Sequence, residues 1–213
     1  MTEPFDDKHI GEHDWHSQAY CDQWINRDVT RDADRRPVLR RMLELAPFAR
    51  DAAIKVLDVG AGYGVLSEEV LKLFPRARVT LQDYSEPMAE YARKRFAAQG
   101  MTASYIMSDL ADPSWHTRIG GGFELAVSAL AVHNLEREPL IKGCYGSIRR
   151  VLRPGGLFLD YDLFGLVPGG VAQHMQWLVE AGFEQPRCIW EQLPIAIISA
   201  QAPPIAAPSV SSR

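Results

Sequence analysis

The sequence contains little of what marks several common classes of protein. Its 213 residues include only three cysteines, Cys21, Cys144 and Cys188, which lie far apart and without CxxC spacing. Neither a disulfide framework nor a zinc site is therefore indicated, and isolated thiols suit a reducing compartment. No apolar run is long enough to cross a bilayer, and the polar start MTEPFDDKHIGEHDW is not typical of a signal peptide. We expect a cytoplasmic protein with no membrane partner and no bound metal.

A surplus of positive charge is also missing. The chain has 23 Lys and Arg residues against 27 Asp and Glu residues, a net charge of −4. Proteins that bind nucleic acid without specificity neutralise phosphates with Lys and Arg, so this balance argues against a nucleic-acid partner. Arginines do cluster in residues 31–41, but Asp28, Asp32 and Asp34 are interleaved with them. That pattern favours a solvated helix face over a phosphate or RNA patch.

The apolar residues, 46% of the chain, show two periods. A helical pattern covers residues 14–45, with Pro37 suited to the first turn of a second helix. From residue 54 strands and helices alternate, which predicts a parallel sheet with helices on both faces. The expected strands are 54–59, 78–82, 103–107, 123–130, 157–160, 187–190 and 195–200, and the expected helices are 67–74, 85–100, 140–152 and 171–181.

The last two strands are too close in sequence for a crossover helix between them, so they must pair antiparallel. The polar residues 1–12 and the Pro-, Ser- and Ala-rich residues 201–213 are typical of disordered ends. The predicted organisation is an N-terminal helical extension over residues 1–50, a core over residues 51–200 and a disordered tail over residues 201–213.

Three glycines follow the first predicted strand in the stretch KVLDVGAGYGVL. Gly60, Gly62 and Gly64 allow a sharp strand-to-helix turn and a close approach of a ligand to the backbone. The N–H groups at the start of the following helix point to the same place. A dinucleotide fingerprint needs GxGxxG, but this run is GxGxG with Val65 next. Asp58 precedes the glycines, where it would repel a pyrophosphate and attract a cation, so a nicotinamide cofactor is disfavoured.

Two further carboxylates follow the next two strands. Asp83 ends RVTLQD, and an acid about 20 residues after the glycines can accept both hydroxyls of a ribose. Asp109, in YIMSDL, can accept from the amine of an adenine while Leu110 packs on the ring. Each acid alone is compatible with a helix cap or a loop residue, but three at the same edge of the sheet indicate a nucleoside site.

These residues resemble the class I S-adenosylmethionine-dependent methyltransferases over residues 54–200. The stretches that carry the resemblance are VLDVGAGYG, DYSEPMAEYARKRF, SDLADPSW, FELAVSALAVHNL and IRRVLRPGGLFLDYD. The family implies an α/β, three-layer Rossmann-like fold with a seven-stranded, mostly parallel sheet, its last strand antiparallel, and an N-terminal helical lid. It also implies S-adenosyl-L-methionine as cofactor. The cofactor contacts implied by the resemblance are Asp58, Gly60, Ala61, Gly62, Tyr63, Gly64, Asp83, Tyr84, Met88, Ser108, Asp109, Leu110 and Ser128.

The resemblance also suggests residues near the transferred methyl group and over the cofactor. His133, in the loop after the fourth strand, is the candidate base, and a packed or capping histidine is the alternative. Trp15, His16, Tyr20 and Trp24 resemble the lid of small-molecule methyltransferases, with Tyr20 and Trp24 expected to face the cofactor. Ordinary helix packing is the alternative for these side chains.

One departure from the family concerns the link after the fifth strand. Small-molecule enzymes of the family usually carry a helical insert there, whereas this chain has only LFGLVPGGV, residues 163–171. Without that insert, the acceptor site is open to a large acceptor, or a partner completes it, or acceptor binding has been lost. The predicted function is methyl transfer to a small-molecule acceptor. The alternatives are a non-catalytic cofactor-binding protein or partner subunit, or a tRNA or protein methyltransferase, and a homodimer is left open.

Overall fold

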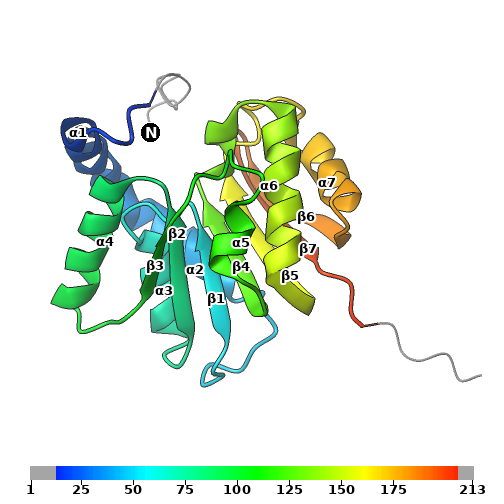
Figure 1. Cartoon of the computed structure of the whole chain (residues 1–213), viewed down its shortest axis with the longest axis horizontal. Coiled ribbons are helices and arrows are strands. Elements are labelled where there is room, and N and C mark those ends of the chain that lie inside the picture. Colours follow the sequence, from blue (N-terminus) through cyan, green and yellow to red (C-terminus); the bar gives the residue numbers. More distant parts are fainter. Residues whose placement is uncertain (1–12, 206–213) are drawn as a thin grey trace, which may run out of the picture.

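A computed structural model describes residues 13–205, so the disorder expected for residues 1–12 and for residues 206–213 lies outside the described part. A seven-stranded sheet forms its centre, in the order β3-β2-β1-β4-β5-β7-β6 (Figure 1). β7 runs antiparallel to both of its neighbours and the other pairs are parallel, which confirms the predicted fold class. The strands are β1 (Lys55–Val59), β2 (Arg78–Asp83), β3 (Ser104–Met107), β4 (Phe123–Ala129), β5 (Leu152–Asp162), β6 (Glu184–Gln192) and β7 (Ile195–Gln201).

Helices cover both faces of the sheet, and each face has its own hydrophobic core. In β1, Val56 belongs to the core shared with α2, α3 and α4, whereas Leu57 and Val59 belong to the core shared with α6 and α7. Burial on both faces explains why the strand carries apolar residues on both of its sides rather than on one. The helices are α1 (Gln18–Asp28), η2 (Val29–Arg31), α2 (Asp32–Leu43), α3 (Val65–Leu73), α4 (Glu86–Ala98), α5 (Trp115–Ile119), η3 (Val132–Leu135), α6 (Glu138–Val151) and α7 (Gly170–Glu180).

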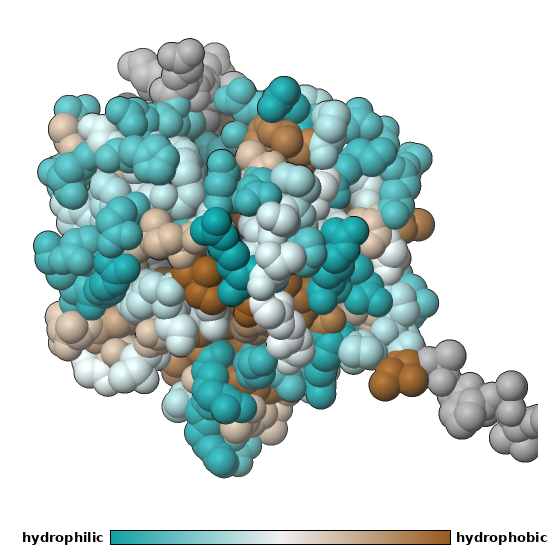
Figure 2. Space-filling view, viewed as in Figure 1, coloured by the Kyte–Doolittle hydropathy of each residue, from teal (hydrophilic) through white to brown (hydrophobic). Residues whose placement is uncertain are grey.

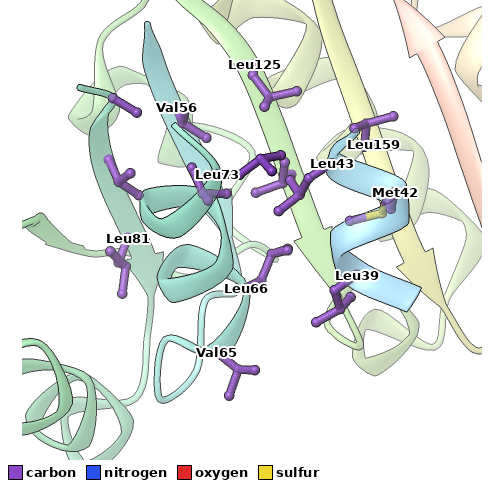
Figure 3. Close-up of a cluster of buried hydrophobic side chains, with 14 of the residues drawn as sticks. Leu39, Met42, Leu43, Val56, Val65, Leu66, Leu73, Leu81, Leu125 and Leu159 are labelled. Atoms are coloured by element: carbon purple, nitrogen blue, oxygen red, sulfur yellow. The ribbon is translucent and has the colours of Figure 1, made fainter. Parts of the chain in front are cut away.

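The predicted N-terminal extension is not uniform. Leu39, Met42 and Leu43 of α2 are at most 1% exposed and pack toward Leu125 of β4 and Leu159 of β5 (Figure 3). Burying a leucine side chain contributes roughly 1.5–3 kcal/mol to the free energy of unfolding. α2 is therefore an integral layer of the fold, and only the segment before it, with α1, lies where a lid would lie.

Several boundaries differ from the sequence-based expectation. Pro37 lies inside α2 rather than in its first turn, because the helix begins at Asp32, where the acidic Asp32 and Asp34 suit a helix N-terminus. The short α5 and η3 were not predicted. The disordered tail was placed too early, since Gln201 ends β7 and the Ala202 N–H donates to the Gly156 carbonyl at 2.8 Å.

The surface agrees with a chain rich in charged residues. Figure 2 shows a face covered mainly by hydrophilic residues, with hydrophobic residues visible in patches between them. Within residues 13–205, no helix is both long and apolar enough to span a membrane.

Candidate functional site

A cavity of about 310 Å³ opens at the carboxyl ends of β1, β2 and β4. The strand order reverses between β1 and β4, and ligands of open α/β sheets bind at such a switch point. Its size falls at the lower end of the range usual for small-molecule pockets. The residues that line it are Trp15, Trp24, Asp28, Arg35, Leu39, Asp58, Gly60, Ala61, Gly62, Tyr63, Val65, Leu66, Gln82, Asp83, Tyr84, Met88, Asp109, Leu110, Ala111, Ala129, Leu130, Ala131, Asn134, Leu135 and Leu140.

The glycine turn forms the floor of this cavity. Gly60 has a φ of +63°, and a Cβ atom there would come within 2.4 Å of the Ala131 Cβ. Gly60 therefore lets the turn approach the loop after β4. Gly62 has a φ of +53° with no atom within 4 Å of a Cβ position, so its conformation rather than its packing requires glycine.

Gln82 connects the loops around the cavity, and the sequence analysis did not identify it. Its Oε1 accepts from the Gly60 N–H at 2.9 Å, and its Nε2 donates to the Ser108 carbonyl at 2.6 Å. The side chain is fully buried and lines the cavity. A long polar residue directly after the buried Leu81 of the strand RVTLQD is the signal that could have revealed it, because buried polar groups need partners.

Asp83 lies at the end of β2, as predicted, and faces the glycine turn. One carboxylate oxygen accepts from the Gly62 N–H at 2.7 Å and the other from the Ser85 N–H at 2.9 Å. Burial raises the pKa of Asp83 above its ordinary value, although these backbone donors act in the opposite direction. A carboxylate has about four acceptor positions, so it retains capacity for ligand hydroxyls.

Asp58 is a second buried carboxyl on the cavity wall, 1% exposed. Its Oδ2 accepts from the Ser67 hydroxyl at 2.6 Å. Burial, and to a smaller extent the neighbouring Asp83, raises the pKa of Asp58 to about 7, although the hydrogen bonds from Ser67 act in the opposite direction. A carboxyl of this kind favours a cation in the cavity, because a nearby positive charge would stabilise its ionised form.

The residues predicted to lie near an adenine are also found on the cavity wall. Tyr84, Met88, Asp109 and Leu110 all line the cavity. Asp109 accepts from the Ala111 N–H at 2.8 Å, which fixes the direction of its carboxylate within the loop after β3. An acid, an apolar side chain and an aromatic ring at one end of the cavity can hold a flat, polar ring.

The segment before α1 lies against the loop after β2. The Trp15 carbonyl accepts from the Ser85 hydroxyl at 2.5 Å, and the His16 ring packs edge-on against Tyr84 with centroids 5.0 Å apart. Trp15 and Trp24 line the cavity and pack edge-on against each other at 5.4 Å. These contacts support the lid interpretation for Trp15 and Trp24.

The arginine cluster is only in part the solvated helix face that the sequence suggested: Arg31, Arg40 and Arg41 are exposed, but Arg35 and Arg36 are not. Arg35 donates to both carboxylate oxygens of Asp28 and to Asp32 at 2.6 Å, and Arg36 pairs with Glu68 and Glu69 of α3. The helical period predicted an exposed face, but Glu68 and Glu69 lie on α3, a partner that local sequence does not reveal. Asp28 and Arg35 line the cavity, so they are site residues that the sequence analysis missed.

Ion pairing shifts the pKa values of Glu68 and Arg35 in this cluster. Burial alone would raise the pKa of Glu68, but Lys72, Arg95 and Arg36 lower it to about 2. Burial alone would also lower the pKa of Arg35, but Asp28 and Asp32 raise it above its ordinary value. Glu68 and Arg35 therefore remain ionised at neutral pH.

Five predicted site residues do not line the cavity. A Cβ atom at Gly64 would meet Ala92 and Phe96 of α4 at 3.3 Å, so Gly64 serves helix packing. Tyr20 bonds His13 and packs on Trp15 rather than facing the cavity. The remaining three, Ser108, Ser128 and His133, are buried behind the wall.

His133 has a structural partner in place of a ligand. Its Nδ1 lies 2.6 Å from Asp162 Oδ1, and its backbone N–H donates to Asp162 Oδ2 at 3.0 Å. Burial alone would raise the pKa of Asp162, but His133 and the Leu163 N–H hold it below its ordinary value. The pair fastens η3 to the end of β5, and the residues of η3 that line the cavity are Asn134 and Leu135.

The short link after β5 is packed down onto the fold. The Gly165 N–H donates to the Pro194 carbonyl at 2.9 Å, and His174 Nε2 lies 3.2 Å from the Pro168 carbonyl. Leu163 and Phe164 are each 1% exposed. The link therefore does not cover the cavity, as its length indicated.

Comparison with known proteins also points to a methyltransferase. Residues 56–156 match the family model described as methyltransferase domain. The chain is 34% identical over 92 residues to ribosomal RNA small subunit methyltransferase C of Enterobacter sp. (strain 638), a match that covers 43% of this chain and 25% of that protein. The chain thus spans about a quarter of the length of this curated relative.

Solved methyltransferase structures share the fold along most of the chain. An O-methyltransferase family protein from Burkholderia thailandensis superposes with a TM-score of 0.71 at 15% identity, over 89% of this chain and 61% of that chain. Human N-acetylserotonin methyltransferase, solved in complex with S-adenosylmethionine, gives a TM-score of 0.69 at 16% identity, over 89% and 57%. Together with the glycine turn and the sheet order, these findings are consistent with a class I S-adenosylmethionine-dependent methyltransferase.

Proposed function

We propose that this chain binds S-adenosylmethionine in the cavity and directs its methyl group to a small-molecule acceptor. The observation that carries the proposal is the glycine turn joined to Asp83. The Gly62 N–H, the Asp83 carboxylate and the buried Asp58 converge on one cavity at the switch point of the sheet. Donors and carboxylates together suit a ligand that is a nucleoside at one end and carries positive charge at the other.

The protein's own contribution would be positioning. S-Adenosylmethionine supplies a methyl group on a sulfonium, which is already activated for transfer. The glycine turn and Asp83 would hold the ligand, while Trp15 and Trp24 would exclude water from above. Among the described residues that line the cavity there is no histidine, and Asp162 holds His133 behind the wall. The proposal therefore assigns no proton transfer to His133.

The charge of the wall favours an uncharged or cationic acceptor. Four carboxyl groups line the cavity, from Asp28, Asp58, Asp83 and Asp109, against the single guanidinium of Arg35. An anionic acceptor would be repelled, whereas apolar side chains such as Leu135 and Leu140 suit an apolar molecule. The same acidity, with the net charge of −4, speaks against RNA as acceptor.

Two alternatives to a small-molecule methyltransferase are each favoured by one observation. The curated relative is a ribosomal RNA methyltransferase, but the match covers less than half of this chain. A non-catalytic or partner-dependent protein is the second alternative, since the link at residues 163–169 leaves the cavity without an inserted cap.

The test has two stages. Calorimetric titration with S-adenosylhomocysteine should show one site, and NAD at the same concentrations should show none. A screen with isotope-labelled methyl donor should then compare uncharged and cationic small molecules with phosphorylated ones and with RNA. Transfer to RNA alone would replace the proposed acceptor class, and binding without any transfer would favour the non-catalytic alternative. Absence of S-adenosylhomocysteine binding would overturn the proposal as a whole.

A further inference from the structure

Gln82, near the end of β2, holds the glycine turn and the loop after β3 with a single side chain. Its Oε1 accepts from the Gly60 N–H at 2.9 Å, and its Nε2 donates to the Ser108 carbonyl at 2.6 Å. One partner is a donor and the other an acceptor, and this fixes the orientation of the amide. The side chain is fully buried and lines the cavity. A side chain of another length or polarity could not make both bonds.

The next residue of β2, Asp83, adds to this connection. Successive side chains of a strand point to opposite faces of the sheet, so Gln82 and Asp83 hold the glycine turn from two sides. Gln82 accepts from the Gly60 N–H, and Asp83 accepts from the Gly62 N–H at 2.7 Å. The Asp83 carbonyl also accepts from the Ser108 N–H at 3.0 Å. The end of β2 therefore joins the glycine turn to the loop after β3.

The loop after β3 carries the side chains expected to hold an adenine. Asp109 directly follows Ser108 and Leu110 comes next, and both Asp109 and Leu110 line the cavity. A Cβ atom at Gly60 would lie 3.8 Å from Leu110 Cδ1, so this loop approaches the glycine turn closely. The bond from Gln82 is made to the residue before Asp109. It therefore bears directly on the distance between the Asp109 carboxylate and the glycine turn.

We propose that Gln82 is a positioning residue that makes the site selective for a purine with an exocyclic amine, because it holds the loop of Asp109 at a fixed distance from the glycine turn. The inference rests on the proposed function, since it requires a nucleoside ligand whose amine meets Asp109. A hydrogen bond weakens steeply when its distance or angle is wrong, so the placement of Asp109 decides how much the amine contributes. Without Gln82, the Gly60 N–H and the Ser108 carbonyl lose this partner and the loop loses an anchor.

The first measurement compares two ligands on the intact protein. S-Adenosylhomocysteine is titrated by calorimetry beside an analogue in which hydrogen replaces the amine of the adenine. We expect the wild-type protein to bind the analogue at least about tenfold more weakly, as for the loss of a hydrogen bond to a charged group. Equal affinities for the two ligands would overturn the inference while leaving the proposed function intact. If neither ligand binds, the proposed function fails and the inference fails with it.

The second measurement varies the protein. Gln82→Met keeps the length of the side chain but neither bond, and Gln82→Asn keeps an amide that is one methylene too short to reach both partners. In each variant that circular dichroism shows to be folded, the affinity ratio between the two ligands should fall below about threefold. Ile148→Val, in the core beside α6, is the control for a general loss of stability and should keep the wild-type ratio. An unchanged ratio in the folded variants rejects the inference. Failure of both variants to fold with saturating S-adenosylhomocysteine also rejects it, because Gln82 would then serve stability rather than selectivity.

A double-mutant cycle separates an effect through Asp109 from a direct contact between Gln82 and the ligand. Asp109→Ala alone should also lower the ratio, because it removes the acceptor proposed for the amine. Adding Gln82→Asn to Asp109→Ala should then change the ratio no further, since both substitutions act on the same hydrogen bond. Additive losses would show that Gln82 contacts the purine itself, and its assignment as a positioning residue would be wrong.

Discussion

At the scale of single residues, a substitution of Asp83 tests whether the nucleoside end of the ligand binds where we propose. Asp83→Ala removes the acceptor proposed for two hydroxyls and also the partner of the Gly62 N–H. Loss of charge-assisted bonds should weaken S-adenosylhomocysteine binding by roughly 10- to 150-fold, or about 1.5–3 kcal/mol. Asp109→Ala should have a smaller effect, because it would remove one contact to an amine. Calorimetric titration measures both, with Asp112→Ala, a loop aspartate off the cavity wall, as control. Wild-type affinity in Asp83→Ala would remove the ribose assignment.

Asp58 predicts a pH dependence of ligand binding. Burial raises its pKa to about 7, so the carboxyl is mostly neutral at pH 6 and mostly ionised at pH 8. A ligand with a positive charge is bound better by the ionised form. If only that form binds, affinity should be about tenfold weaker at pH 6 than at pH 8.

The measurement is a series of S-adenosylhomocysteine titrations between pH 6 and pH 8. Asp58→Asn cannot ionise and should make the affinity nearly independent of pH over this range. Asp109→Asn, which changes a carboxyl in the loop after β3, should keep the wild-type profile. A flat profile in the wild-type protein would show that Asp58 does not sense the ligand's charge.

At the scale of elements, α1 and α2 differ in their expected response to ligand. α2 is already packed into the core through Leu39, Met42 and Leu43, whereas the segment before α1 touches the site through Trp15. Closing a segment over a ligand orders it. We therefore expect slower amide hydrogen exchange in residues 13–28 with S-adenosylhomocysteine bound and little change in residues 32–43.

A truncation complements the exchange measurement. Removing residues 1–30 deletes Trp15 and Trp24 but leaves the sheet and α2, so the protein should remain folded by circular dichroism and bind ligand more weakly. Unchanged exchange in residues 13–28, together with full affinity of the truncated chain, would show that α1 is a packing element and not a lid.

At the scale of the whole molecule, binding of the ligand should raise the stability of the fold. The cavity joins β1, β2, β4, α1 and α2, so its occupant contacts elements that come apart on unfolding. At about 100 times its dissociation constant, a ligand that binds only the folded state adds roughly 2.7 kcal/mol to the free energy of unfolding. Thermal melts with S-adenosylhomocysteine should show this, while NAD, the control, should leave the transition in place. The reverse pattern would indicate a dinucleotide site.

The sequence by itself determined the strand–helix alternation, the glycine turn and the positions of Asp58, Asp83 and Asp109. These features are local, because a run of apolar residues, a glycine or an acid at a strand end depends on the neighbouring residues alone. Parallel strands then bring such ends to one edge of the sheet, and so the three acids line one cavity as expected. The antiparallel final pair also followed from sequence, since the connection between β6 and β7 is too short for a crossover.

Only the tertiary structure decided which buried polar groups meet. Arg36 pairs with Glu69, at a sequence separation of 33 residues, and His133 pairs with Asp162, at a separation of 29. The Ser85 hydroxyl donates to the Trp15 carbonyl, at a separation of 70. Helical or strand periodicity indicates which side of an element is buried, but it carries no information about the partner on the next element. For that reason the arginines were expected on a solvated face and His133 at the reaction site, whereas the folded chain places Arg35 on the cavity wall and His133 behind it.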